Sequence, residues 1–282
     1  MTITRIEDST DERMEPYANL TAHQLKSRLH PENAQVILET LLVIQAAFDA
    51  GVEICSILVD ERHVKTLQDA LPRLAERDIP VYVASREVLS AITGINVTRG
   101  YLACARRPQG REPQALLDQA QRLVVLEGLT DVSNVGAVFR SAAALGADGI
   151  LLAPTCADPL NRRSIRVSMG TLFRLPWARA EGEWPQATFQ ALATRGYSSV
   201  ALALTPTALP IDEAGRRLAE RAATGGSGRV ALFFGTEGTG LTREVLDRCD
   251  LHAVIPMQRG VDSLNVAASS AVACFELFGR SS

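Results

Sequence analysis

Residues 229–241 read RVALFFGTEGTGL, an apolar run of strand length followed by a turn that contains three glycines. Continuous apolar runs of this length are typical of strands buried on both faces of a parallel sheet. Four further runs of the same kind occur at residues 123–126, 149–152, 198–204 and 251–255. Segments of helical character separate them, so the sequence predicts an α/β domain whose parallel sheet is covered by helices on both faces.

The helices of this domain are expected where apolar residues recur with helical spacing and capping residues stand at the ends. These segments are residues 134–145, 184–194, 242–249 and 265–278. The front half of the chain repeats the alternation on a smaller scale. There we expect helices at residues 34–50 and 62–77, and strands at residues 54–59, 79–83 and 101–105.

The length of 282 residues exceeds one average domain and fits two. Residues 106–122 combine Pro and Gly with little apolar content before Leu116, which is typical of a linker. Residues 1–20 are polar and acid-rich and are expected to be a tail. The expected order is therefore the tail, a smaller α/β domain at 21–105, the linker, and the parallel-sheet domain at 123–282.

The composition, with 46% hydrophobic and 22% charged residues, is that of an ordinary globular protein. The longest apolar runs are far shorter than the ~20 residues of a membrane span, and the first residues show no secretory signal. Five scattered cysteines without a C-x-x-C pair, and four histidines without a cluster, argue against a disulfide framework or a metal site. We therefore expect a cytoplasmic protein with no membrane partner and no metal.

Ligands of open parallel sheets bind beyond the carboxyl ends of the strands, and three loops qualify: residues 127–134, 235–241 and 256–264. Glycines in the second loop allow a backbone to approach a ligand closely. This loop has neither the order of G-x-G-x-x-G nor the lysine of a P-loop, which disfavours a dinucleotide or a nucleoside triphosphate. Glu237 repels phosphate and suits a ligand with hydroxyls or a positive charge. The alternative is a purely structural turn between a strand and a helix.

The other two loops each lead into a helix, for which Asn134 and Ser263 are good N-caps. Arg140 lies six residues after Asn134, about 240° around the helix. It is either a surface cation whose apolar stem packs on the helix or a functional cation. Ser263 and Asn265 either cap backbone groups or take part in a site.

Taken together and in this order, three motifs resemble the signatures of the SpoU/TrmH family of the SPOUT methyltransferases. They are N-x-G-x-x-x-R at residues 134–140, F-G-x-E-G-x-G-L at 234–241, and I-P-M followed by S-L-N-V-A at 255–267. The resemblance spans about residues 123–280. Residues 21–105 more loosely resemble the small substrate-binding domain, related to ribosomal RNA-binding proteins, that many members carry in front. The thiostrepton-resistance rRNA methyltransferases share this layout.

The resemblance implies an enzyme that transfers a methyl group from S-adenosylmethionine to a ribose 2′-hydroxyl of ribosomal or transfer RNA. It also implies a homodimer and a deep C-terminal trefoil knot, in which backbone groups hold most of the cofactor. By position, the cofactor-binding residues are Gly235, Ile255, Met257 and Leu264. The catalytic residues are Arg140, Asn134, Glu237, Ser263 and Asn265.

A sulfonium donor carries a positive charge and a good leaving group, so this reaction requires no metal. The ribose hydroxyl must lose its proton, and the resemblance gives this step to Arg140. Because the pKa of a guanidinium exceeds about 12, we interpret Arg140 as an electrostatic stabiliser of the developing alkoxide, not as a simple general base.

Two acid-free stretches offer local anion-binding patches on a chain whose net charge is only −3. One contains Arg162, Arg163 and Arg166, and the other contains Lys26 and Arg28. We expect both to contact RNA phosphates. The alternative for each is a solvated surface.

Three other functions stay open. A catalytically inactive RNA-binding module of the same fold would not need Glu237, Ser263 and Asn265 together with Arg140. A nucleotide-dependent enzyme of Rossmann type would carry the glycine fingerprint that is missing here. A serine hydrolase would carry G-x-S-x-G, which is also missing, and would have only His252 available after His63.

Overall fold

The structure, a computed structural model, describes residues 2–18, 34–94, 97, 99–258, 260 and 263–279. It divides into two compact units. Unit 1 consists of Met1–Gln109 and Asp158–Arg174, and unit 2 consists of Gly110–Ala157 and Leu175–Ser282. The segment Asp158–Arg174 therefore packs with the front half of the chain, although the sequence analysis placed it in the domain at 123–282.

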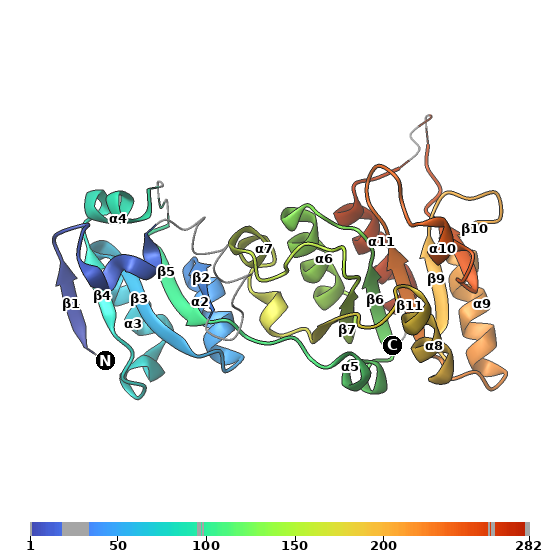
Figure 1. The fold of residues 1–282 in the computed structure, drawn as a ribbon, viewed down its shortest axis with the longest axis horizontal. Helices are drawn as coiled ribbons and strands as arrows, with labels where there is room; N and C mark the ends of the chain where they lie inside the picture. The colour runs from blue at the N-terminus through green and yellow to red at the C-terminus, as the bar shows by residue number, and fades with distance from the viewer. Residues whose placement is uncertain are drawn as a thin grey trace. The chain divides into compact units, whose positions relative to one another are not determined.

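Unit 1 is built on a five-stranded mixed sheet with helices between its strands (Figure 1). The strand order is β1 (Ile3–Ile6), β4 (Val81–Ala84), β3 (Ile54–Asp60), β5 (Tyr101–Arg106) and β2 (Gln35–Glu39). β1, β4 and β3 run parallel, whereas β5 runs antiparallel to β3 and β2. The helical segments are η1 (Glu12–Tyr17), α2 (Leu41–Asp49), η3 (Glu61–His63), α3 (Val64–Ala70), η4 (Pro72–Ala75), α4 (Arg86–Thr93), α7 (Arg162–Val167) and η5 (Thr171–Phe173).

The described part of residues 1–20 is not a tail, which corrects the expectation. β1 pairs with β4 in parallel over its whole length. In η1, Met14 and Tyr17 are buried, and the Tyr17 hydroxyl lies 2.7 Å from the Oγ atom of Ser56. A few apolar side chains, dispersed among acidic ones, thus fix this segment to the sheet without producing a recognisable hydrophobic pattern.

The helix expected at residues 34–50 is wrong in its first part, because residues 35–39 form β2 and α2 begins only at Leu41. Thr40 separates the two with a φ of 79°, a left-handed conformation that β-branched residues rarely adopt. A short apolar run alone does not distinguish a buried strand from a helix. The helix expected at residues 62–77 is also interrupted, since Pro72 follows the end of α3.

Unit 2 contains a seven-stranded sheet whose paired strands all run parallel (Figure 1). The strand order is β10 (Leu209–Pro210), β12 (Leu251–Val254), β9 (Ser198–Leu202), β11 (Val230–Phe234), β6 (Arg122–Leu126), β7 (Gly149–Leu152) and β8 (Trp177–Arg179). The helices are α5 (Pro113–Gln119), α6 (Val132–Ala144), α8 (Gln186–Thr194), α9 (Ile211–Ala223), α10 (Arg243–Leu246) and α11 (Val266–Phe278). The α/β class with a parallel sheet and a second, smaller sheet is confirmed, while β8, β10, α5 and α9 were not expected.

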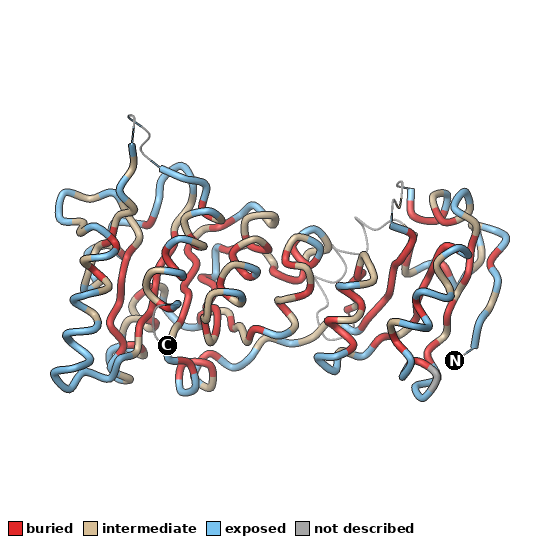
Figure 2. Tube along the Cα trace, turned by 180° about the vertical axis from the view of Figure 1, so that it is seen from behind, coloured by how far each residue is buried: buried red, intermediate tan, exposed pale blue. Residues whose placement is uncertain are grey.

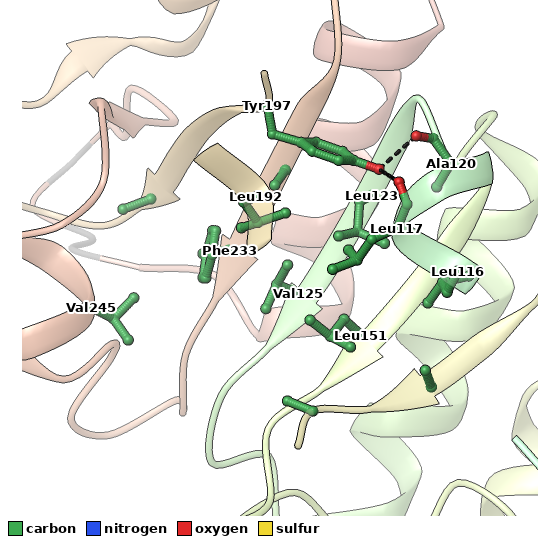
Figure 3. Close-up of a cluster of buried hydrophobic side chains, with 14 of the residues drawn as sticks. Leu116, Leu117, Ala120, Leu123, Val125, Leu151, Leu192, Tyr197, Phe233 and Val245 are labelled. Carbon is green, nitrogen blue, oxygen red and sulfur yellow. Dashed lines mark hydrogen bonds between the residues drawn. The ribbon is translucent and has the colours of Figure 1, made fainter. Parts of the chain in front are cut away.

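Alternate side chains of each strand in unit 2 point to opposite faces of the sheet. Leu123 and Val125 of β6 contribute to a core that α5, α8 and α10 close with Leu117, Leu192 and Val245 (Figure 3). On the other face α11 packs against α6 and α9. Burial is therefore concentrated in the central strands (Figure 2).

The expected linker at residues 106–122 is structured, because α5 lies within it and β6 begins at its end. Leu117 of α5 is 2% exposed. The Tyr197 hydroxyl lies 3.0 Å from the carbonyl oxygen of Leu117 and 2.5 Å from that of Ala120, and these carbonyls can only accept (Figure 3). Burial raises the pKa of Tyr197 to about 12. Residues 110–122 are thus part of unit 2, and α5 contributes to its core.

Candidate functional site

A pocket of about 350 Å³ lies beyond the carboxyl ends of β9, β11 and β12 in unit 2. Its walls are the glycine-rich loop after β11, the residues that follow β9 and β12, and the start of α11. This volume falls within the range of about 300–1,000 Å³ that small-molecule sites occupy. The four residues expected to bind a cofactor all line the pocket, namely Gly235, Ile255, Met257 and Leu264.

The glycine-rich loop closes on itself as a tight turn. The backbone N–H of Thr236 donates to the carbonyl of Gly240, and that of Gly240 donates to the carbonyl of Thr236, both at 3.1 Å. A Cβ atom on Gly235 would overlap the backbone of Gly240 and Leu241, so this position requires glycine. The loop therefore lines the pocket largely with backbone and small side chains.

The three signature motifs meet at the carboxylate of Glu237, which also lines the pocket. The Nδ2 group of Asn134, in the first turn of α6, donates to Glu237 Oε1 at 2.8 Å. The Nδ2 group of Asn265 donates to the same oxygen, and to Asn134 Oδ1 at 3.2 Å. Asn265 is also the N-cap of α11, since its Oδ1 accepts from the N–H of Ala267 at 2.9 Å. Asp131, not Asn134, caps α6.

The two remaining catalytic candidates differ in their placement. Ser263 lines the pocket, whereas Arg140 does not. Six residues of helix put Arg140 about 9 Å beyond Asn134 along α6 and on a different face. The side chain of Arg140 is exposed and makes no hydrogen bond or ion pair to the rest of the described chain. The structure thus gathers Asn134, Glu237, Ser263 and Asn265, and leaves Arg140 outside the pocket of its own chain.

Residues 121–275 match the model of the SpoU rRNA Methylase family. The chain belongs to this family. An uncharacterised tRNA/rRNA methyltransferase of Mycobacterium bovis is 35% identical over 95% of this chain and 89% of its own length. The 23S rRNA (guanosine(2553)-2′-O)-methyltransferase RlmP of Bacillus subtilis is 26% identical over 98% of this chain and 99% of its own.

The fold of this SpoU family member agrees with that of a solved relative. A crystal structure of an AdoMet-bound rRNA methyltransferase from Sinorhizobium meliloti superposes with a TM-score of 0.77 at 23% identity, covering 98% of this chain and 97% of the other. Family membership confirms the expectation of an RNA methyltransferase that uses S-adenosylmethionine. Two of the three SpoU motifs line the pocket described above, and Asn134 of the first motif is hydrogen-bonded to Glu237 in its wall.

The arginines expected to contact RNA lie on α7 in unit 1, where the fold supplies acidic partners. Arg162 and Arg166 both pair with Glu39 at the end of β2, at 2.6 Å and 3.2 Å. Arg163 is exposed and pairs with no acidic residue in the described chain. Lys26 and Arg28 fall outside the described residues.

Two acidic residues that have partners in the structure were not predicted from the sequence. Glu39 neutralises part of a stretch that contains no acid of its own, and Glu127 is buried at the end of β6. For Glu127 a signal was available, since an acidic residue directly after a central apolar strand needs hydrogen-bond partners. Among the described residues, no group of three or more His, Cys, Asp or Glu is placed to hold a metal. No described helix is both long and apolar enough to cross a membrane.

Proposed function

We propose that this chain transfers the methyl group of S-adenosylmethionine to a ribose 2′-hydroxyl of ribosomal or transfer RNA. The observation that carries the proposal is the meeting of all three motifs at Glu237, beside a pocket of suitable size. The Bacillus subtilis relative is a 2′-O-methyltransferase of 23S rRNA, and this supports the ribose as the acceptor.

The pocket fits the cofactor chemically. Gly235 and the turn that follows it offer backbone groups to a polar ligand, while Ile255, Met257 and Leu264 offer apolar contacts. The carboxylate of Glu237 provides a negative charge, which favours a positively charged ligand over a phosphate. When bound, S-adenosylmethionine would supply an activated methyl group on a sulfonium and would leave as S-adenosylhomocysteine. The residues would position the ribose and stabilise the charge on its oxygen while the hydroxyl proton passes to solvent water.

Arg140 has the chemistry to stabilise that charge. Its guanidinium stays protonated, and donors aimed at a developing oxyanion contribute about 3–4 kcal/mol of transition-state stabilisation. Its exposed side chain has no competing partner in the described chain, so it is available to the RNA. Asn134, Ser263 and Asn265 orient the ribose, and Glu237 holds the two asparagine amides in place.

A homodimer is proposed because α11 carries an exposed apolar face. Ala268, Val272 and Phe275 recur at helical spacing, and Val272 and Phe275 are 40% and 54% exposed. α11 packs against α6, the helix that carries Arg140. We propose that a second copy covers this face and that dimerisation brings Arg140 to a complete site. The C-terminal knot and the cytoplasmic location expected from the sequence belong to the same proposal.

We propose that unit 1 binds the RNA. On α7 the proposed contact is Arg163, which is exposed and pairs with no acidic residue of the described chain. Mapping 2′-O-methylated riboses in RNA from cells with and without the protein tests the function and identifies the nucleotide. One or a few riboses should lose their methyl group in the deletion strain, and expression of the chain should restore it. An unchanged ribose map together with loss of a base methylation would contradict the proposal. The alternative, a catalytically inactive RNA-binding module, predicts that neither ribose methylation nor base methylation changes in the deletion strain.

A further inference from the structure

Glu127 stands directly after β6, at the centre of the sheet, and is 5% exposed. Its carboxylate accepts three hydrogen bonds. Trp184 Nε1 and the Thr242 hydroxyl both donate to Oε1 at 2.9 Å, and the backbone N–H of Thr242 donates to Oε2 at 2.8 Å. The mechanism proposed above does not use this buried, charged group.

The partners of Glu127 lie at both ends of the glycine-rich loop. Thr242 follows the loop directly and is the N-cap of α10. Phe234 precedes the loop, and its carbonyl accepts the backbone N–H of Glu127 at 2.9 Å. The residue that follows β6 is therefore hydrogen-bonded both to the residue before the loop and to the residue after it.

Gly128, the residue after Glu127, also lies against the glycine-rich loop. Gly128 has a φ of +69°, and a Cβ atom there would lie 2.9 Å from Thr236 Cγ2. The backbone after β6 thus lies directly against the loop, with no room for a side chain between them. The path of the loop is fixed by β6 as well as by its own internal hydrogen bonds.

We propose that Glu127 is a positioning residue for the cofactor, because it sets the span between the two ends of the loop that lines the pocket. The inference rests on the proposed placement of S-adenosylmethionine in this pocket. Glu127 does not line the pocket itself, so it acts through the loop.

The hydrogen-bond directions require a carboxylate. Thr242 Oγ1 accepts the N–H of Val245 at 3.4 Å as a helix cap and donates its proton to Glu127. All three groups that face the carboxylate are therefore donors. The amide of a glutamine would turn its own N–H groups toward at least one of them, and an unmade bond of this kind in a buried site is costly.

The test compares Glu127→Gln with matched variants in the full-length protein. Thr242→Val removes one donor together with the cap of α10 and keeps the size of the side chain, whereas Trp184→Phe removes another donor and leaves the cap in place. Thr242→Ser keeps both the donor and the cap. We expect Glu127→Gln to weaken S-adenosylmethionine binding by about 10- to 100-fold in titration calorimetry. Thr242→Val and Trp184→Phe should weaken it by smaller factors, and Thr242→Ser should match the wild type. At saturating cofactor, kcat should stay within about threefold of wild type in each.

Amide hydrogen exchange of residues 235–241 distinguishes positioning of the loop from a general loss of stability. The exchange rate of these residues should rise in Glu127→Gln and Thr242→Val by more than that of the rest of unit 2. The inference is overturned if these variants lose thermal stability while cofactor affinity and loop exchange stay at wild-type values. Gly235→Ala separates this failure from failure of the proposed function. If Gly235→Ala abolishes binding and Glu127→Gln does not weaken it, only the role of Glu127 is wrong. If Gly235→Ala binds normally, the placement of the cofactor is wrong as well.

Discussion

Asn134 and Glu237 are 103 residues apart in the chain, and Asn134 Nδ2 donates a 2.8 Å hydrogen bond to Glu237 Oε1. Asn265 donates to the same oxygen from the third motif. A carboxylate oxygen has room for two such donors, and both of them come from motifs other than its own. The first and third motifs are therefore bonded to each other through the second.

Asn265 has two separable roles, as the cap of α11 and as a donor to Glu237. Aspartate is a good N-cap, so Asn265→Asp should keep most of the stability that Asn265→Ala loses, about 1 kcal/mol. It should nevertheless lower kcat by at least about tenfold, because it replaces a donor with a second carboxylate facing Glu237. Thermal unfolding and single-turnover methyl transfer measure the two effects. If activity follows stability across both variants, the hydrogen bond to Glu237 has no catalytic role.

A double substitution tests the direction of this bond. In Glu237→Gln combined with Asn265→Asp, the Nε2 group of the glutamine can take the place of Glu237 Oε1 and donate to the new carboxylate, provided that the Asn134 amide turns over so that its Oδ1 accepts from the glutamine. Part of the activity lost in Asn265→Asp should return. Activity no better than that of the single variants would show that the charge of Glu237 itself is needed.

Arg140→Ala should lower kcat by about 10²- to 10³-fold, the usual loss when one donor to an oxyanion is removed. S-adenosylmethionine should bind the variant within about twofold of wild type, because Arg140 does not line the pocket. Arg140→Lys keeps the charge and should recover only part of the rate, since a guanidinium and an ammonium differ in geometry. An Arg140→Ala variant with wild-type turnover would refute the assignment.

Phe275→Glu should convert the protein to a monomer in light-scattering measurements, because it places a charge in the exposed apolar face of α11. Methyl transfer should fall with the dimer, while unfolding stays cooperative. Leu42→Glu is a matched control, since Leu42 is 56% exposed but lies on α2 in unit 1. A monomeric Phe275→Glu variant with full activity would show that each chain is complete alone.

Arg163→Gln should reduce the salt dependence of RNA binding by about 0.7–0.9 in log–log slope, the contribution of one phosphate contact. Substituting Arg162 or Arg166 should change the slope less, because Glu39 already pairs with both. Arg111→Gln provides the control, since Arg111 is an exposed arginine of unit 2 that, like Arg163, pairs with no acidic residue of the described chain. Equal slopes for Arg163→Gln and the wild type would argue that α7 does not contact RNA.

The parallel sheet could be predicted from the sequence because each buried strand is a short continuous run of apolar residues. The expected strand at residues 149–152 matches β7, and the other runs differ from β6, β9, β11 and β12 only at their ends. Parallel strands bring their carboxyl ends to one edge, and two of the three expected loops, at residues 235–241 and 256–264, contribute to the pocket. The loop at residues 127–134 does not line it, and the contribution of the residues after β9 was not expected.

What could not be predicted depends on partners distant in sequence. Arg166 and Glu39 are 127 residues apart, so an acid-free stretch gave no sign that the fold would neutralise it. The boundary between β2 and α2 rests on the left-handed backbone of Thr40, a conformation that its residue type disfavours. The position of Arg140 relative to a complete site depends on a second chain in our proposal, and no pattern in one sequence specifies that arrangement.

The most direct test of the account is to incubate the purified protein with RNA and S-adenosylmethionine carrying a tritiated methyl group, and then to digest the RNA to nucleosides. We expect the label to appear in 2′-O-methylated nucleosides, and we expect Arg140→Ala, with its cofactor affinity intact, to label the RNA about 10²- to 10³-fold more slowly. Label on a base, or equal labelling by Arg140→Ala, would contradict the account.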